Sequence, residues 1–140
     1  MDDPIVFAHE RLDAYRLAHE FVAGAARLIA GMPRGEHALA DQLRRAADSA
    51  LLNLSEGAAR TAARDKAHFY DIARGSAVEC AAILDAFGIR ALAPAGEIDR
   101  VRTTLYRTVC LLGGLARSAR GRRRPDRVAA GAARLRESLH

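Results

Sequence analysis

Four long segments of the chain carry apolar residues at every third or fourth position, which is the repeat of an amphipathic helix. The chain has only four prolines, and the breaks between the segments are short. The pattern predicts helices over about residues 10–31, 36–59 and 62–88, and a further one from about residue 97 to 120. Such helices with short loops favour an all-α, antiparallel up-and-down four-helix bundle over residues 1–120. Residues 121–140 are predicted to form an arginine-rich C-terminal arm, partly helical or mobile.

Composition limits the kind of core and the location of the protein. Apolar residues make up 50% of the chain and aromatic residues only 5%, which favours closely packed helices over a bulky sheet core. No apolar run approaches the roughly 20 residues of a membrane span, and "MDDPIVFAHE" lacks the order of a signal peptide. We therefore expect a cytoplasmic protein without membrane contact. Cys80 and Cys110 fall within helical patterns and are expected to be buried thiols, not a disulfide.

The sequence lacks the common signatures of an enzyme. It contains no HExxH, P-loop or GxGxxG motif, and the Glu-x-x-His spacing of a di-iron bundle occurs only at Glu137 and His140. We therefore expect a protein that is not an enzyme, with no catalytic residue, no metal and no cofactor.

Positive charge is concentrated towards the C-terminus. Residues 100–140 contain eleven basic and two acidic side chains, and all eleven basic ones are arginines. A guanidinium donates two parallel hydrogen bonds to a phosphate, so this composition suits a nucleic-acid partner. It equally suits a solvated surface or an acidic protein partner, and the charge pattern leaves these alternatives open.

A polar stripe accompanies the apolar face of the helix expected over residues 36–59. Its members follow one another at steps of three or four and therefore share one face: Gln42, Arg45, Ser49, Asn53, Glu56 and Arg60. At the edge of a bundle, such a stripe can hydrogen-bond to a neighbouring helix and fix its register. On the next helix, Gly75 predicts a close approach of another backbone, and Glu79 is expected to pair with Arg45 or Arg74.

The first predicted helix is apolar over more than half of its circumference. One apolar stripe contains Tyr15, Val22 and Ile29, and a second contains Leu17, Phe21 and Leu28. A helix of this kind usually contacts the bundle core on one side and another subunit on the other. Leu52, on the outer face of the second helix, is another apolar side chain where water is expected. These features predict a homo-oligomer.

Two motifs carry a family resemblance. The segments "QLRRAADSALLNLSEGAAR" and "HFYDIARGSAVEC" resemble the bacterial four-helix-bundle proteins of the 23S rRNA intervening-sequence family, and the likeness extends from about Phe7 to Ala119. The residues that match the family pattern are Gln42, Leu43, Arg44, Arg45, Ser49, Asn53, Glu56, Gly57, Arg60, Phe69, Ala73, Gly75, Ser76 and Glu79.

The resemblance implies an oligomer with an accessory role. Relatives of the family include the accessory variability determinant of diversity-generating retroelements, which resembles a ring of five bundles whose basic surface engages reverse transcriptase and nucleic acid. By this resemblance we expect a ring-like homopentamer with Leu17, Phe21, Leu28 and Leu52 at the subunit interface. The motif residues Gln42, Arg45, Ser49, Asn53, Glu56, Gly57, Gly75, Ser76 and Glu79 would form a structural scaffold inside each bundle.

These observations lead to one functional hypothesis and one alternative. We expect a homo-oligomeric accessory protein that binds RNA or an RNA–protein complex through phosphates, with no aromatic platform for stacking bases. The alternative is a protein-only scaffold that docks an acidic partner. The candidate nucleic-acid-binding residues are Arg44, Arg60, Arg64, Lys66, Arg117, Arg120, Arg122, Arg123, Arg124 and Arg127.

Overall fold

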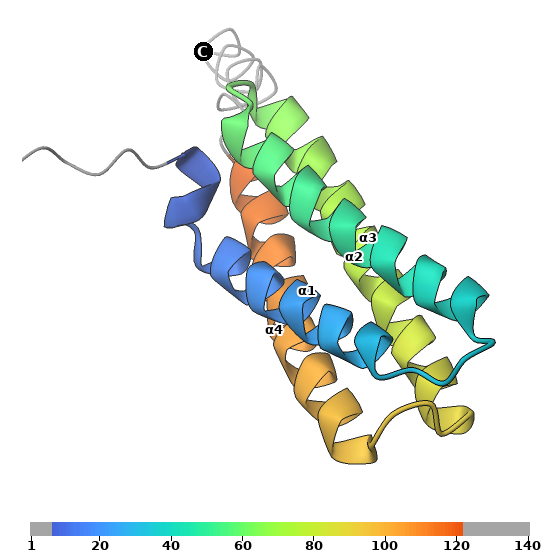
Figure 1. Cartoon of the computed structure of the whole chain (residues 1–140). Helices are drawn as coiled ribbons and strands as arrows, with labels where there is room; N and C mark the ends of the chain where they lie inside the picture. The colour runs from blue at the N-terminus through green and yellow to red at the C-terminus, as the bar shows by residue number, and fades with distance from the viewer. Residues whose placement is uncertain (1–6, 122–140) are drawn as a thin grey trace, which may run out of the picture.

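The computed structural model describes residues 7–121, which form one short 3-10 helix and four α-helices (Figure 1). The 3-10 helix η1 covers Ala8–Arg11. The α-helices are α1 (Asp13–Ala30), α2 (His37–Ala59), α3 (Ala63–Ile89) and α4 (Ala95–Gly121). No β-strand occurs among these residues, so the all-α prediction is confirmed for the described part of the chain. Apart from Gly121, the predicted C-terminal arm lies outside the described residues.

Each helix packs against two others in a closed cycle. The pairs in contact are α1 with α2, α2 with α3, α3 with α4, and α4 with α1. Successive helices run in opposite directions and are joined by short connections, as Figure 1 shows. This is the up-and-down arrangement that the spacing of the apolar residues predicts. The α2–α3 connection, the start of α1 and the end of α4 consequently lie at the same end of the bundle.

Local capping moves the helix ends by a few residues from their predicted positions. Leu12 is extended, with φ −86° and ψ 133°, so α1 begins at Asp13 and not at Glu10. Ala62 is the residue before α3, so this helix begins one residue later than predicted, and the Ala62 side chain makes no capping hydrogen bond. The backbone N–H groups of Glu97 and Ile98 donate to the Pro94 carbonyl, which starts α4 slightly earlier than predicted.

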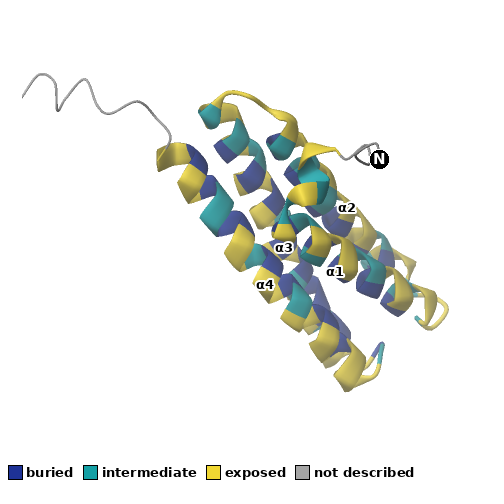
Figure 2. Cartoon of the chain, turned by 90° about the vertical axis from the view of Figure 1, so that its left-hand side faces the viewer, coloured by how far each residue is buried: buried dark blue, intermediate teal, exposed yellow. Residues whose placement is uncertain are grey.

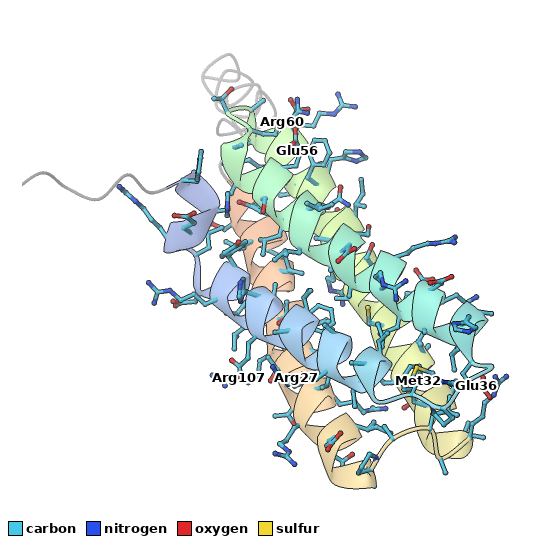
Figure 3. The ribbon with its side chains drawn as sticks, in the orientation of Figure 1. Arg27, Met32, Glu36, Glu56, Arg60 and Arg107 are labelled. Carbon is cyan, nitrogen blue, oxygen red and sulfur yellow. The ribbon has the colours of Figure 1, made fainter. Side chains whose placement is uncertain are left out.

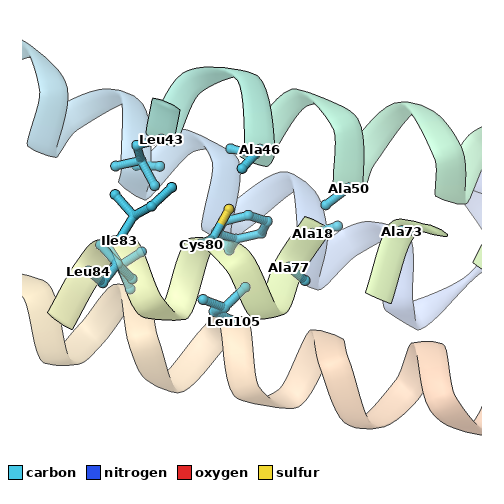
Figure 4. Close-up of a cluster of buried hydrophobic side chains, with 14 of the residues drawn as sticks. Ala18, Leu43, Ala46, Ala50, Ala73, Ala77, Cys80, Ile83, Leu84 and Leu105 are labelled. Carbon is cyan, nitrogen blue, oxygen red and sulfur yellow. The ribbon is translucent and has the colours of Figure 1, made fainter. Parts of the chain in front are cut away.

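Small residues allow the helices to pack closely. Figure 4 shows Ala46 and Ala50 of α2 facing Ala77 and Cys80 of α3, with Leu105 of α4 beneath them. Buried residues line the inner side of all four helices, and exposed ones cover the outside (Figure 2). The core is therefore built mainly from alanine and leucine, as the low aromatic content predicts.

The α1 helix presents to the core of its own bundle most of the apolar stripe that was expected to face another subunit. Phe21 and Leu28 are only 0% and 2% exposed within their own bundle, which corrects the prediction that they face another subunit. Tyr15, Val22 and Ile29 are only partly buried against this core. The physical reason is the set of small residues beside Phe21 and Leu28, including Ala18 and Ala25, which bring α1 close to its neighbours on that side. Leu17 remains partly exposed.

The inner face of α3 contains Ala73, Ile83, Leu84 and Phe87. Tyr70 and Ala77 are buried, whereas Phe69 and Ser76 are partly buried and Ile72 is exposed. Cys80 lies in the core as expected, but Cys110 is exposed on α4, which corrects the prediction that both thiols are buried.

Candidate functional site

The polar stripe of α2 lies at the seam between α2 and α3, where part of it joins the two helices. The Ser49 and Ser76 hydroxyl oxygens are 2.7 Å apart, within hydrogen-bond distance. The Asn53 side-chain amide donates to the Ser49 carbonyl at 2.8 Å and to the Ser49 hydroxyl at 3.1 Å. The predicted hydrogen bond between neighbouring helices is thus confirmed at Ser49, and the partly buried network fixes the register of α2 against α3.

The remainder of the stripe is on the surface and not inside the bundle. Gln42 and Arg45 are exposed, as is Glu79 on the facing side of α3. Within residues 7–121, no ion pair joins Glu79 to Arg45 or Arg74, so the expected partner is not found there. The motif residues therefore do not all lie inside the bundle, contrary to the prediction. Ser49 and Asn53 are partly buried between α2 and α3, and Gln42, Arg45 and Glu79 face the solvent.

The close contact expected at Gly75 occurs at Gly57 instead. Gly75 is exposed, and no atom of the described residues would lie within 4 Å of a Cβ at this position. Gly57 is buried, and a Cβ there would lie 2.8 Å from Cδ1 and Cε1 of the Tyr70 ring. Gly57 is therefore the residue that lets α3 approach α2 near their connection.

Lys66, a candidate RNA-binding residue, has a structural role in the same region. Its ammonium group donates to the carbonyl oxygens of Gly57 at 3.1 Å and Ala58 at 2.9 Å. These carbonyls belong to the last turn of α2, where backbone acceptors lack partners within the helix. Lys66 thus caps α2 from α3, a role that charge patterning in the sequence does not reveal.

Four of the candidate arginines lie towards the end of the bundle that carries the α2–α3 connection. We call this surface the basic end, and it comprises Arg60, Arg64, Arg117 and Arg120 from the neighbouring ends of α2, α3 and α4. All four side chains are exposed.

Two of these arginines are held by other side chains. Arg60 pairs with Glu56 at 2.5 Å, and its guanidinium lies 4.8 Å from the centre of the Phe69 ring (Figure 3). Arg120 of α4 pairs with Asp71 of α3. Arg64 and Arg117 form no ion pair within the described part of the chain, so their charges are available to an external anion.

Arg44, another candidate, is not at the basic end. Arg44 pairs with Asp41 at 2.5 Å. It lies 16 residues before Arg60 on α2, which corresponds to roughly 24 Å along the helix axis. The last four candidates, Arg122, Arg123, Arg124 and Arg127, lie outside the described residues.

The basic end also contains a small cavity of about 160 Å³. It lies between η1 and the ends of α2, α3 and α4, and its lining is mostly apolar, with Leu12 and Leu115 among the contacts. Within residues 7–121, no three His, Cys, Asp or Glu side chains gather as metal ligands would. None of the helices in this part of the chain has the apolar length of a membrane span.

The comparisons with known proteins identify a family. Residues 10–113 match the family model described as 23S rRNA-intervening sequence protein, and the match covers well over half of the chain. The matched range includes the α2–α3 seam and most of α4. The search of curated proteins found no match.

Proposed function

Because the chain belongs to the 23S rRNA-intervening sequence protein family, we propose that it binds structured RNA through its arginines, without catalysing a reaction. The family description refers to ribosomal RNA, which favours RNA over DNA as the partner. The proposed setting is the cytoplasm, with RNA or an RNA–protein complex as the ligand. A reverse transcriptase or another protein that handles the RNA is a compatible further partner.

The observation that carries this proposal is that exposed arginines at the end of α2 and on α3 and α4 lie towards the same end of the bundle. Arg64 and Arg117 have no ion-pair partner among residues 7–121, so a phosphate would not have to displace a carboxylate from them. Guanidinium contacts with phosphates carry no base information. Recognition would therefore depend on the shape and charge of the RNA and weaken with added salt.

A homo-oligomer, with five subunits suggested by the family resemblance, would strengthen this binding. Each copy would present its own basic end, so several weak phosphate contacts would act on one RNA. Leu52 is 66% exposed on α2 and is our candidate for a subunit contact, together with the partly exposed Leu17.

The alternative is a protein-only scaffold that docks an acidic partner. The exposed apolar side chains of Leu52, Ile72 and Val78 on α2 and α3 favour it, because apolar anchors inside a charged rim are typical of protein interfaces. Nuclease treatment separates the two proposals. A partner that remains bound after the RNA is digested supports the scaffold.

The test is the affinity of the full chain for a fluorescent RNA hairpin, compared between two single substitutions. Arg64→Gln removes a charge at the basic end, and Arg34→Gln removes one from the α1–α2 connection at the opposite end. We expect Arg64→Gln to weaken binding severalfold at low salt and Arg34→Gln to have a smaller effect. The RNA affinity of a chain that stops at Gly121 measures how much the arginines after that residue contribute to binding. Equal effects of both substitutions would contradict binding at the basic end.

A further inference from the structure

The seam between α3 and α4 has two acid–base pairs with an arginine pair between them. Asp71 pairs with Arg120 near one end of the seam, and Asp85 pairs with Arg102 towards the other. The helices are antiparallel, so a step of three residues forward on α3 corresponds to three residues back on α4. That step from Asp71 and Arg120 leads to Arg74 opposite Arg117, where a third acid–base pair would be expected.

A glycine brings the two guanidinium groups together. A Cβ at Gly113 would lie 3.3 Å from Nη1 of Arg117 and 3.6 Å from Nε of Arg74. A Cβ at the next residue, Gly114, would lie 3.9 Å from Nη2 of Arg117. Gly113 is buried, although Arg74 and Arg117 are themselves exposed. Both arginines therefore lie over a glycine surface, with their charged groups still accessible to solvent.

This arrangement lacks a negative charge. Within residues 7–121, neither Arg74 nor Arg117 forms an ion pair or a hydrogen bond with another side chain. The acid one turn away from Arg74, Asp71, is already paired with Arg120. Two like charges brought close together repel each other, and a bound anion would convert that repulsion into attraction for both.

We propose that Arg74 and Arg117, above Gly113 and Gly114, form a binding site for one phosphate group. Resting on the proposed function, the ligand is a backbone phosphate of the bound RNA. A phosphodiester has two non-bridging oxygens, so each guanidinium can donate to one of them. The glycines leave room for the two planar groups to lie flat beside the helix. Arg74 thereby extends the basic end along the α3–α4 seam.

The first test uses inorganic phosphate and sulfate as probes and needs no RNA. Thermal unfolding of the full chain is measured in sodium chloride, phosphate and sulfate at equal ionic strength. We expect phosphate and sulfate to raise the unfolding temperature of the wild type above its value in chloride. The increase should disappear in Arg74→Gln/Arg117→Gln, which should fold normally because both side chains are exposed. It should persist in Arg107→Gln, which removes an exposed charge from the same helix (Figure 3).

The second test measures RNA-hairpin affinity in the same variants. The double variant should bind about tenfold more weakly at low salt, and the slope of log affinity against log salt should fall by about 0.9, as for one lost phosphate contact. The single losses should not add, because both arginines hold the same group. Arg74→Lys/Arg117→Lys keeps the charge but loses the forked donor geometry, and it should restore affinity only in part.

The outcomes separate this proposal from the proposed function. If the wild type binds RNA but the double variant behaves like Arg107→Gln, the phosphate site is wrong and the proposed function stands. If the wild type does not bind RNA yet phosphate and sulfate stabilise it through the two arginines, the site takes a free phosphate and the RNA ligand is wrong. If neither anion stabilises the wild type more than chloride does, and the losses of RNA affinity in Arg74→Gln and Arg117→Gln add up to that of the double variant, the site is overturned.

Discussion

Gly57 is a point of close approach between α2 and α3. The Tyr70 ring occupies the space that a side chain at this position would need, at 2.8 Å from the ideal Cβ. Gly75 belongs to the same pair of motifs, yet it faces solvent on α3. Two glycines that look alike in the sequence thus have opposite structural roles.

The two glycines therefore give opposite expectations for stability. Gly57→Ala should destabilise the protein by about 1–3 kcal/mol, because the Tyr70 ring must move within a packed core. Gly75→Ala should stabilise it by about 0.5–1 kcal/mol, because alanine restricts the unfolded chain and no neighbour is displaced. Urea denaturation measures both. A loss of stability in Gly75→Ala would show that a close contact exists at that position.

The two thiols should also differ in reactivity. Burial, with a smaller contribution from the charge of Glu79, raises the pKa of Cys80 to about 12. The thiolate is the reactive form, so Cys80 should be inert near pH 8 in the folded protein. Cys110 is exposed and should react. Titration with a disulfide reagent should show one fast thiol in native protein and both in denaturant, and Cys110→Ser should remove the fast phase. Rapid reaction of both native thiols would contradict the burial of Cys80.

The connection between α2 and α3 is held by Lys66, which stabilises the last turn of one helix from the first turn of the next. The substitution Lys66→Met keeps much of the apolar stem and removes the donor. We expect a loss of about 1–2 kcal/mol in the free energy of unfolding, because two carbonyl oxygens lose their bonds.

Arg64 provides the matched comparison for Lys66. It is exposed on the same turn of α3 and forms no ion pair within the described residues, so Arg64→Met should leave stability almost unchanged and weaken RNA binding. Unfolding followed by circular dichroism and RNA affinity measured by fluorescence anisotropy, on both variants, would show that Lys66 stabilises the fold and Arg64 binds RNA. The reverse pattern would refute this assignment.

The sequence predicts the helices better than it predicts their rotation. Steps of three and four residues correctly placed Ser49 and Asn53 at a bundle edge. Polar side chains are few beside the apolar face of α2, so their spacing defines one side of the helix. In α1 the pattern fails because the helix is apolar on two sides, and periodicity alone does not say which side meets Ala18 and its neighbours in the core. The approach of Arg74 to Arg117 over Gly113 could not be predicted from the sequence either, since it depends on the register of α4 against α3.

At the scale of the whole bundle, the exposed apolar side chain of Leu52 lies apart from the basic end. Leu52 projects from the middle of α2, whereas the basic end is formed by the ends of three helices. This separation would allow subunits to associate without covering the arginines. It also means that assembly and RNA binding can be altered independently.

Leu52→Glu should test the assembly. The side chain is exposed, so the change should be tolerated by the fold, but a charge at a subunit contact should reduce the mass measured by light scattering. Ile89→Glu is the matched control, since Ile89 is 86% exposed at the end of α3, away from the middle of α2. A monomeric wild type would contradict the oligomer, and an unchanged mass in Leu52→Glu would remove Leu52 from the interface.

Recognition of RNA through arginines is tested by the affinity of the full chain for a structured RNA hairpin as a function of salt concentration. Binding through several arginine–phosphate contacts predicts measurable affinity at low salt and a steep linear fall of log affinity with log salt. A weak dependence on the hairpin's base sequence is expected as well. Absence of binding at the lowest salt concentration, or an affinity insensitive to salt, would contradict the proposal that this protein recognises RNA through its arginines.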